Sequence, residues 1–128
     1  MAKILLIEPD RILAETYAQA ILAAGHQVAV APGAQSGILV ADQFQPDLAV
    51  IELQLAGHSG IEFLYEFRSY ADWQHVPVII QSQVPPREFQ ASLELLQNEL
   101  GVQDYLYKPH ATLKDLISRI HQYLAVTA

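Results

Sequence analysis

Acidic, hydroxyl and lysine side chains follow four of the short apolar runs in this sequence. Glu8 and Asp10 come directly after the first run, Glu52 ends the third, Ser82 ends the fourth and Lys108 ends the fifth. Carboxylates can hold a divalent cation, and a lysine beside a hydroxyl can bind the oxygens of a phosphoryl group. The same residue types also form plain compensated ion pairs at strand ends, so the chemistry depends on whether the fold brings them together.

The runs that precede these residues have the pattern of buried strands. They occupy residues 3–7, 27–31, 47–52, 76–82 and 104–108. In residues 48–51 and 78–80 the apolar residues do not alternate with polar ones, which is typical of strands covered on both faces of a parallel sheet. The sequence therefore predicts five short, buried strands.

Segments with helical spacing separate these strands. Apolar residues recur every three or four positions within residues 13–24, 61–67, 89–100 and 113–124. Ser59 is suited to cap one of these helices, with Glu62 at the spacing of a capping box, and Thr112 is suited to cap the last. The helical pattern of residues 34–44 is the weakest, because Gly33 and Gly37 dilute it.

The alternation of strands and helices predicts one α/β domain over residues 1–128. It favours a doubly wound, five-stranded parallel sheet of the flavodoxin-like (βα)5 type, with strand order 2-1-3-4-5. Ligands of such sheets bind beyond the carboxyl ends of the strands. The polar residues named above are all expected at that edge, so the sequence predicts a single functional site there.

Composition excludes several classes of protein. The chain is 52% hydrophobic and 16% charged, which excludes disorder. Its formal net charge is −7 with scattered basic residues, so we expect no direct binding to nucleic acid. No apolar run is long enough for a membrane span and the first residues do not form a secretory signal, so we expect a cytoplasmic protein. There is no cysteine, and the five histidines lack metal-ligand spacing.

Several stretches of the sequence resemble the receiver domain of bacterial two-component response regulators. Residues 3–10 are similar to the family's first strand and acidic corner, and residues 46–60 to its central strand and following loop. Residues 76–82 are similar to its fourth strand with a terminal hydroxyl, and Lys108-Pro109 matches its lysine-proline signature. The resemblance covers nearly the whole chain, and the stretches occur in the family's order.

The resemblance implies a signalling module and not an enzyme. In that family an aspartate at the end of the third strand accepts a phosphoryl group from a histidine kinase, with help from magnesium. By this resemblance Ser82 and Lys108 would contact the phosphoryl oxygens, and Tyr105 would be the aromatic residue that swings inward. The protein partners, a sensor kinase or a downstream effector, would bind the face formed by the fourth helix, the fifth strand and the fifth helix.

This sequence departs from the family pattern at the positions that carry the chemistry. The phosphoacceptor position holds Glu52 and not aspartate. Glu8 keeps the first acidic position, but the metal-binding acid is replaced by Pro9, and Asp10 is displaced by one residue. We therefore expect that Glu52 is not phosphorylated in normal use, that magnesium binds weakly, and that no other metal or cofactor is held.

Two interpretations of Glu52 are open at this point. Its carboxylate could reach towards Lys108 and Ser82 and partly imitate an aspartyl phosphate, or it could form a plain salt bridge with Lys108. Two alternative functions also stand beside the phosphorylation-independent module. One is a receiver that still accepts a phosphoryl group on Glu52 or Asp10 with magnesium, and the other is a binder of a small ligand in the acidic pocket.

Overall fold

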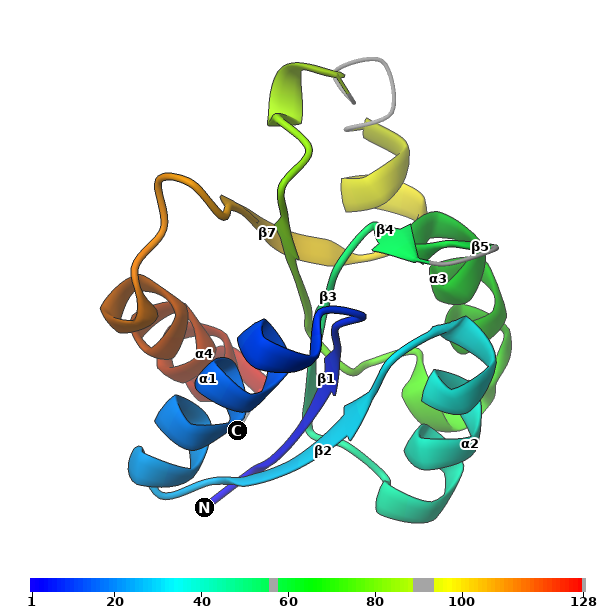
Figure 1. Ribbon diagram of the computed structural model, residues 1–128. Helices are drawn as coiled ribbons and strands as arrows, with labels where there is room; N and C mark the ends of the chain where they lie inside the picture. Colours follow the sequence, from blue (N-terminus) through cyan, green and yellow to red (C-terminus); the bar gives the residue numbers. More distant parts are fainter. Residues whose placement is uncertain (56–57, 89–93, 128) are drawn as a thin grey trace.

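Five parallel strands form the central sheet of the molecule (Figure 1). The structure is a computed structural model, which describes residues 1–55, 58–88 and 94–127. The strands are β1 (Lys3–Ile7), β2 (Gln27–Ala31), β3 (Leu48–Ile51), β6 (Val78–Ser82) and β7 (Val102–Tyr107). Their order across the sheet is β2-β1-β3-β6-β7. Counted along the chain, this is the order 2-1-3-4-5, so the predicted flavodoxin-like fold is confirmed.

Strand ends agree with the sequence prediction to within two residues. The bounds of β1 and β2 are those predicted, whereas β3 is one residue shorter at each end. Hydrogen bonds nevertheless continue beyond β3, because the Asp47 N–H donates to Lys3 O at 2.7 Å and the Glu52 N–H donates to Ile7 O at 3.0 Å. β7 begins two residues earlier than predicted, because Val102 already pairs with Val78 before an irregularity in the ladder.

Helices cover both faces of the sheet (Figure 1). α1 (Arg11–Ala23) and α4 (Leu113–Thr127) pack on one face around buried Ile21, Leu116 and Ile120. α2 (Ala34–Phe44), α3 (Gly60–Ser69) and the short π-helical turn η3 (Leu95–Glu99) pack on the other, around Phe63, Phe67 and Leu96. Within the described part of the chain, no helix is both long enough and apolar enough to cross a membrane.

Side chains cap three of the helices. The Asp10 carboxylate accepts hydrogen bonds from the first backbone N–H groups of α1. Ser59 accepts from the Glu62 N–H at 3.1 Å, and Thr112 accepts from the Asp115 N–H at 3.1 Å. The predicted caps Ser59 and Thr112 are therefore confirmed, and both satisfy backbone donors that a helix leaves unpaired.

The glycine that weakened the prediction of α2 is a packing requirement. A Cβ atom at Gly37 would lie 2.7 Å from the Ile7 side chain and 2.9 Å from the Phe63 ring. A larger residue would force the Ile7 or Phe63 side chain to shift, so the loss of helix propensity at Gly37 is offset by close packing of α2 against β1 and α3. The helix itself forms over the predicted residues.

Part of the predicted fourth helix, residues 89–100, lies outside the described residues, namely residues 89–93. Glu94 is α-helical, and the residues after it form the π-helical turn η3, in which the Leu100 N–H donates to Leu95 O at 3.1 Å. The small elements that precede β6 were not predicted. They are the two-stranded ribbon of β4 (Gln54–Leu55) and β5 (His58–Ser59), and the single turn η1 (Ala71–Trp73).

A half-buried arginine ties these irregular segments together. The guanidinium of Arg68, on α3, donates hydrogen bonds to Leu100 O at 2.8 Å, Trp73 O at 2.7 Å and Gly101 O at 3.2 Å. Burial lowers the pKa of Arg68 from its ordinary value. The three carbonyls belong to chain turns without a regular hydrogen-bond ladder, so Arg68 supplies donors that secondary structure does not.

Candidate functional site

The site is built where β1, β3 and β7 end. Ile7 pairs with Ile51 in the sheet, so the next residues, Glu8 and Glu52, emerge side by side. Lys108 follows β7 directly and reaches the same edge. Glu8 is 3% exposed and Glu52 is 4% exposed, so two carboxylates are buried together at the carboxyl edge of the sheet.

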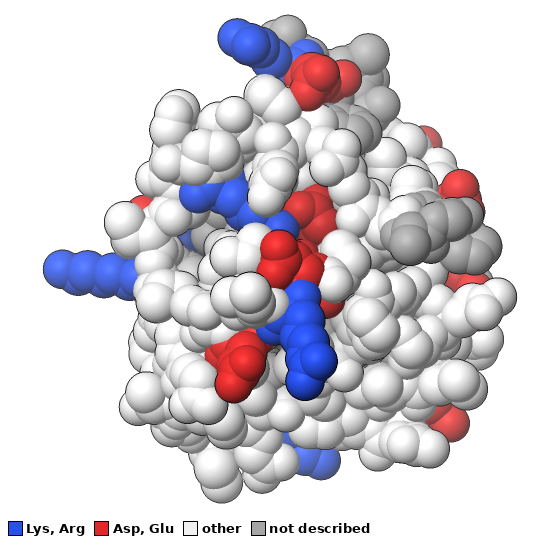
Figure 2. Space-filling model, in the orientation of Figure 1, with Lys and Arg blue, Asp and Glu red and all other residues white. Residues whose placement is uncertain are grey.

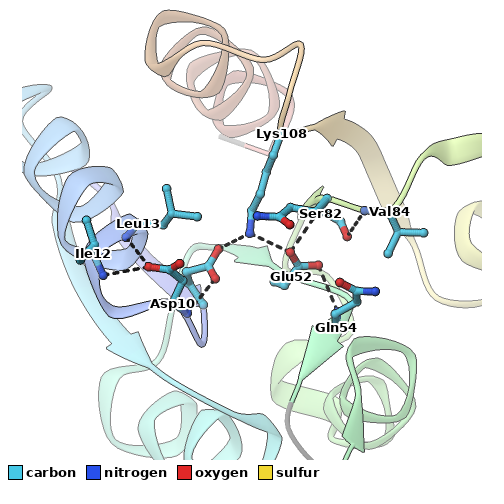
Figure 3. Close-up of polar contacts among 10 residues, drawn as sticks. Asp10, Ile12, Leu13, Glu52, Gln54, Ser82, Val84 and Lys108 are labelled. Atoms are coloured by element: carbon cyan, nitrogen blue, oxygen red, sulfur yellow. Dashed lines mark hydrogen bonds and ion pairs between the residues drawn. The ribbon is translucent and has the colours of Figure 1, made fainter.

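The ammonium group of Lys108 lies between these two carboxylates, and Figure 3 shows its contact with Glu52. Its Nζ is 2.5 Å from Glu8 Oε1 and 2.7 Å from Glu52 Oε1. The Lys108 side chain is itself 7% exposed, so all three charges are shielded from water. Ion pairs that are removed from water interact strongly but carry a large desolvation cost, so each partner depends on the others.

Backbone N–H groups occupy the remaining carboxylate oxygens. Glu8 Oε2 accepts from the Asp10 N–H at 3.0 Å, and Glu52 Oε2 accepts from the Gln54 N–H at 3.0 Å. Glu52 Oε1 also receives a longer hydrogen bond, 3.4 Å, from the Gln83 N–H. Each of the four oxygens therefore has a donor, which is what buried carboxylates require.

The pKa values of the site reflect this pairing. Burial alone would raise the pKa of Glu52, but hydrogen bonds from Lys108, Ser82 and the Gln54 N–H outweigh it, and the pKa lies below its ordinary value. Burial alone would lower the pKa of Lys108, but its hydrogen bonds to Glu52 and Glu8 raise it instead. Lys108 and Glu52 are therefore both charged at neutral pH.

A glycine fixes the chain segment that carries Glu52. The Gly60 N–H donates to Leu53 O at 2.7 Å, at the start of α3. A Cβ atom at Gly60 would lie 2.7 Å from Glu52 O and 2.8 Å from Leu53 Cα. Only glycine allows this approach between two backbones, which holds the end of β3 against α3.

Ser82 and Tyr105 are joined through the loop that follows β6. Ser82 is fully buried, and its Oγ accepts from the Val84 N–H at 3.1 Å. The Tyr105 hydroxyl donates to Val84 O at 2.6 Å. Burial raises the pKa of Tyr105. The half-buried ring of Tyr105 packs against the core on the α2–α3 face. The loop that follows Ser82 is thus held to β7 by one tyrosine.

Asp10 is used differently from the other predicted site residues. Its Oδ1 accepts from the Ile12 and Leu13 N–H groups, each at 3.0 Å, so this carboxylate caps α1 and does not contact Lys108 (Figure 3). The predicted acidic pair of Glu8 and Asp10 is therefore linked only through the Asp10 backbone N–H. Glu8, Glu52, Ser82 and Lys108 are brought together by the fold.

The residues present do not fit a magnesium ion. Mg²⁺ needs oxygen ligands with free lone pairs, in octahedral geometry. Here an ammonium group stands between the two buried carboxylates, and Pro9 occupies the position of a further acid. Across residues 1–55, 58–88 and 94–127, no group of three or more His, Asp or Glu side chains is placed to hold a metal ion.

Charged side chains gather in the middle of one face of the molecule, and others are scattered around its outline (Figure 2). In the space-filling view, red and blue atoms gather in the middle of the face, and most of the surrounding surface is white (Figure 2). The sequence had indicated that Glu8, Glu52 and Lys108 would meet at the carboxyl edge of the sheet, because each lies at or just after the end of a predicted strand. It had not indicated the backbone donors at Asp10, Gln54 and Gln83, since every residue except proline carries an N–H and none is marked in the sequence.

Comparison with known proteins identifies the family. The family model for the response regulator receiver domain matches residues 4–121. The chain is 31% identical over 109 residues to the KDP operon transcriptional regulatory protein KdpE of Escherichia coli, covering 85% of this chain and 45% of that protein. It is 29% identical over 122 residues to the two-component response regulator PhoP of Pseudomonas aeruginosa, covering 95% of this chain and 51% of that protein. The chain belongs to the response regulator receiver domain family, and it spans about half the length of these relatives.

Solved structures show the same fold. The chemotaxis response regulator CheY4 of Vibrio cholerae superposes with a TM-score of 0.83 at 18% identity, covering 95% of this chain and 98% of that one. A sensor protein from Polaromonas sp. JS666 superposes with a TM-score of 0.87 at 20% identity, covering 99% and 98%. These likenesses agree with the CheY-like, flavodoxin-type sheet described above.

Proposed function

We propose that this receiver domain signals without phosphoryl transfer and acts through protein–protein contacts. The observation that carries the proposal is the position of the Lys108 ammonium, between the buried carboxylates of Glu8 and Glu52. This arrangement gives Glu52 a permanent internal partner. A module that contains its own counter-ion does not need a phosphoryl group or a metal ion to complete the site.

The geometry of Glu52 supports the loss of phosphoryl transfer. A nucleophilic carboxylate needs a free oxygen in line with the donor phosphorus, whereas both oxygens of Glu52 accept hydrogen bonds. Glutamate also carries its carboxylate about 1.3 Å further from the backbone than aspartate does. A displacement of about 1 Å at a reacting atom can cost roughly a hundredfold in rate. Pro9 has no carboxylate to bind a metal ion, which is expected to lower the rate of phosphoryl transfer further.

The surrounding contacts support a site held in one state. Glu52 Oε1 reaches both the Lys108 ammonium and the Gln83 N–H, which follows Ser82 in the chain. The carbonyl oxygen of the next residue, Val84, accepts a hydrogen bond from the Tyr105 hydroxyl. Of the two interpretations of Glu52, these contacts favour partial imitation of a phosphoryl group over an isolated salt bridge. The imitation is partial because a carboxylate has less charge and fewer oxygens.

Partners would meet the face formed by η3, β7 and α4, and they would be a sensor kinase or a downstream effector. The two relatives described above are named as regulators and are about twice as long as this chain, so any output activity they possess is not carried over here. Leu96 and Leu100 of the η3 region are buried in this domain. Contacts on this face would therefore use half-buried Leu95 and the edge of β7.

The test is exposure of the purified chain to a phosphodonor. We expect intact mass to show no phosphate after acetyl phosphate with Mg²⁺, and we expect thermal melting to show no shift with beryllofluoride. A matched variant, Pro9→Asp/Glu52→Asp, places aspartate at both altered positions and should gain the beryllofluoride shift by mass action. A magnesium-dependent shift or added phosphate in the unaltered chain, abolished by Glu52→Ala, would overturn the proposal and establish a phosphorylatable receiver.

A further inference from the structure

Two histidines meet at the end of the sheet opposite the lysine site. His26, in the turn before β2, and His121, on α4, are 95 positions apart, and their Nε2 atoms are 2.9 Å apart. The ring centroids are 5.0 Å apart with the rings inclined at 64°. Nitrogen atoms at this distance share a hydrogen bond, so one ring donates and the other accepts.

The backbone decides which ring donates. The Ala2 N–H donates to His26 Nδ1 at 3.1 Å, so that nitrogen carries no proton. The proton of neutral His26 is therefore on Nε2, and it is donated to His121 Nε2. The proton of neutral His121 is then on Nδ1. Both unprotonated nitrogens already accept hydrogen bonds, so adding a proton to either ring breaks one of them.

The charged groups near the pair are one carboxylate and one amino group. A cavity beside the pair is lined by Met1, Ala2, His26, Asp47, His121, Leu124 and Ala125. The carboxylate in this lining belongs to Asp47, and its Oδ2 accepts a hydrogen bond from the Lys3 N–H at 2.8 Å. The last turn of α1, which receives the His26 N–H at Ile21 O, carries no charge. Burial first, then His121 and the amino group at Met1, lower the pKa of His26 below its ordinary value of 6.5.

The same tautomer argument makes the pair a poor metal site. A metal ion bound to His26 Nε2 would move the ring proton to Nδ1, which faces the Ala2 N–H and has no acceptor to donate to. Histidines that bind metal normally donate their other N–H to an oxygen. The arrangement thus suits a neutral pair and disfavours both a proton and a metal ion.

We propose that His26 and His121 form a proton-operated latch, which holds the end of α4 to the turn before β2 at neutral pH and releases it on acidification. Leu116 and Ile120 are fully buried and keep the first turns of α4 in place. Release therefore affects the segment from His121 onward. The latch does not depend on whether Glu52 is phosphorylated, because the two sites lie at opposite ends of the strands.

The direction of the pH effect follows from proton linkage. The unfolded chain binds a proton at His26 more readily than the folded chain does, so the free energy of unfolding decreases as the pH is lowered. The contribution of the latch is complete above the ordinary histidine pKa of 6.5 and is lost as the pH falls below it. Acidification thus weakens the attachment of α4 to the turn before β2.

The test is a ring-proton NMR titration of the folded chain and of the urea-unfolded chain, from pH 8 to pH 5, with amide exchange along α4. We expect the His26 midpoint to be lower in the folded chain, and the amide protection factors after His121, corrected for the pH dependence of intrinsic exchange, to fall as the pH falls. The variant His121→Asn should give low protection factors that no longer change over this range, whereas the exposed-site control His75→Asn should behave like the unaltered chain.

Three outcomes would overturn the latch. The first is a His26 midpoint at or above its unfolded value, and the second is a pH profile of the protection factors that His121→Asn leaves unchanged. The third is stoichiometric binding of Zn²⁺ that protects the end of α4 in the absence of chelator, which would make the pair a metal site. The titration of the unaltered chain decides the first and third outcomes even if the variant folds poorly.

Discussion

Replacing Lys108 with methionine would remove the single cation from two buried carboxylates. At separations of 2.5 and 2.7 Å from Glu8 and Glu52, each contact has a Coulomb attraction of roughly 6 kcal/mol at an effective dielectric constant of about 20, before desolvation. Most of this is cancelled by the cost of burial. Removing one partner of a buried pair nevertheless costs about 3–5 kcal/mol, because the other charge stays buried.

We expect Lys108→Met to lower the free energy of unfolding by about 3 kcal/mol, at the low end of that range. The carboxylates keep their hydrogen bonds from the Asp10 and Gln54 N–H groups, which limits the loss. For a domain of this size the change corresponds to a Tm lower by about 12 °C at pH 7. Adding Glu52→Gln to the variant removes one of the two uncompensated charges and should restore part of the lost Tm.

The pH dependence separates this explanation from a simple loss of packing. In the unaltered chain the pKa of Glu52 lies below its ordinary value of 4.5, so its stabilising contribution is present above pH 4.5 and is lost as the pH falls through the lowered pKa. Without Lys108, burial dominates and the pKa of Glu52 rises. The variant should then become more stable as the pH falls from 7 to 5, measured by thermal melting.

Two results would refute this reasoning. One is a Tm of Lys108→Met within about 3 °C of the unaltered chain at pH 7, which would mean that water already compensates the carboxylates. The other is a variant whose stability falls with pH in parallel with the unaltered chain. Either result would remove the argument that Lys108 replaces an external cation in this site.

Two further substitutions test the segments that support the site. Arg68→Lys keeps the charge but cannot reach three carbonyls at once, so we expect about 2 kcal/mol lower stability in urea unfolding; an unchanged midpoint would contradict its role. Gly60→Ala places a Cβ atom 2.7 Å from Glu52 O and should cost about 1–3 kcal/mol. In the matched control Gly33→Ala nothing lies within 4 Å, and equal losses in both variants would count against the backbone contact at Gly60.

The sheet could be predicted from the sequence because its signals are local. Leu48 to Ile51 and Val78 to Ile80 are unbroken apolar runs, and every residue in them is buried. Helix α2 was also predictable, although Gly37 weakened its pattern. The reason for this glycine could not be seen locally, because it is the packing of α2 against the distant Phe63 ring. The pattern gives the elements, while their contacts explain the exceptions.

The fourth helical segment shows where such patterns fail. Leu96 and Leu100 have helical spacing and are buried as expected. Spacing alone does not distinguish an α-helix from a wider turn, and here Leu100 bonds to a carbonyl five residues back. Side-chain periodicity therefore predicted the buried face correctly and the backbone geometry wrongly.

The candidate site was predictable in its residues and not in its connections. Strand ends meet at one edge in a parallel sheet, which placed Glu8, Glu52 and Lys108 together. The sequence could not show that Asp10 caps α1, because aspartate after a strand serves as a cap or as a ligand equally well. Nor could it show that His26 and His121 meet, since they are 95 positions apart.

The lysine site also has a consequence for how the strands align. Glu52 and Lys108 are 56 positions apart, and they meet only when β3, β6 and β7 pair in their native register. Slipping one strand by a single residue would turn its terminal charge to the opposite face of the sheet and leave the other charges buried without a partner. Apolar strands rich in similar residues tolerate such slips, because their packing changes little. The three charges make a slipped register less stable, because they would be buried without partners. The site thus selects one alignment of a sheet whose hydrophobic residues alone would accept several.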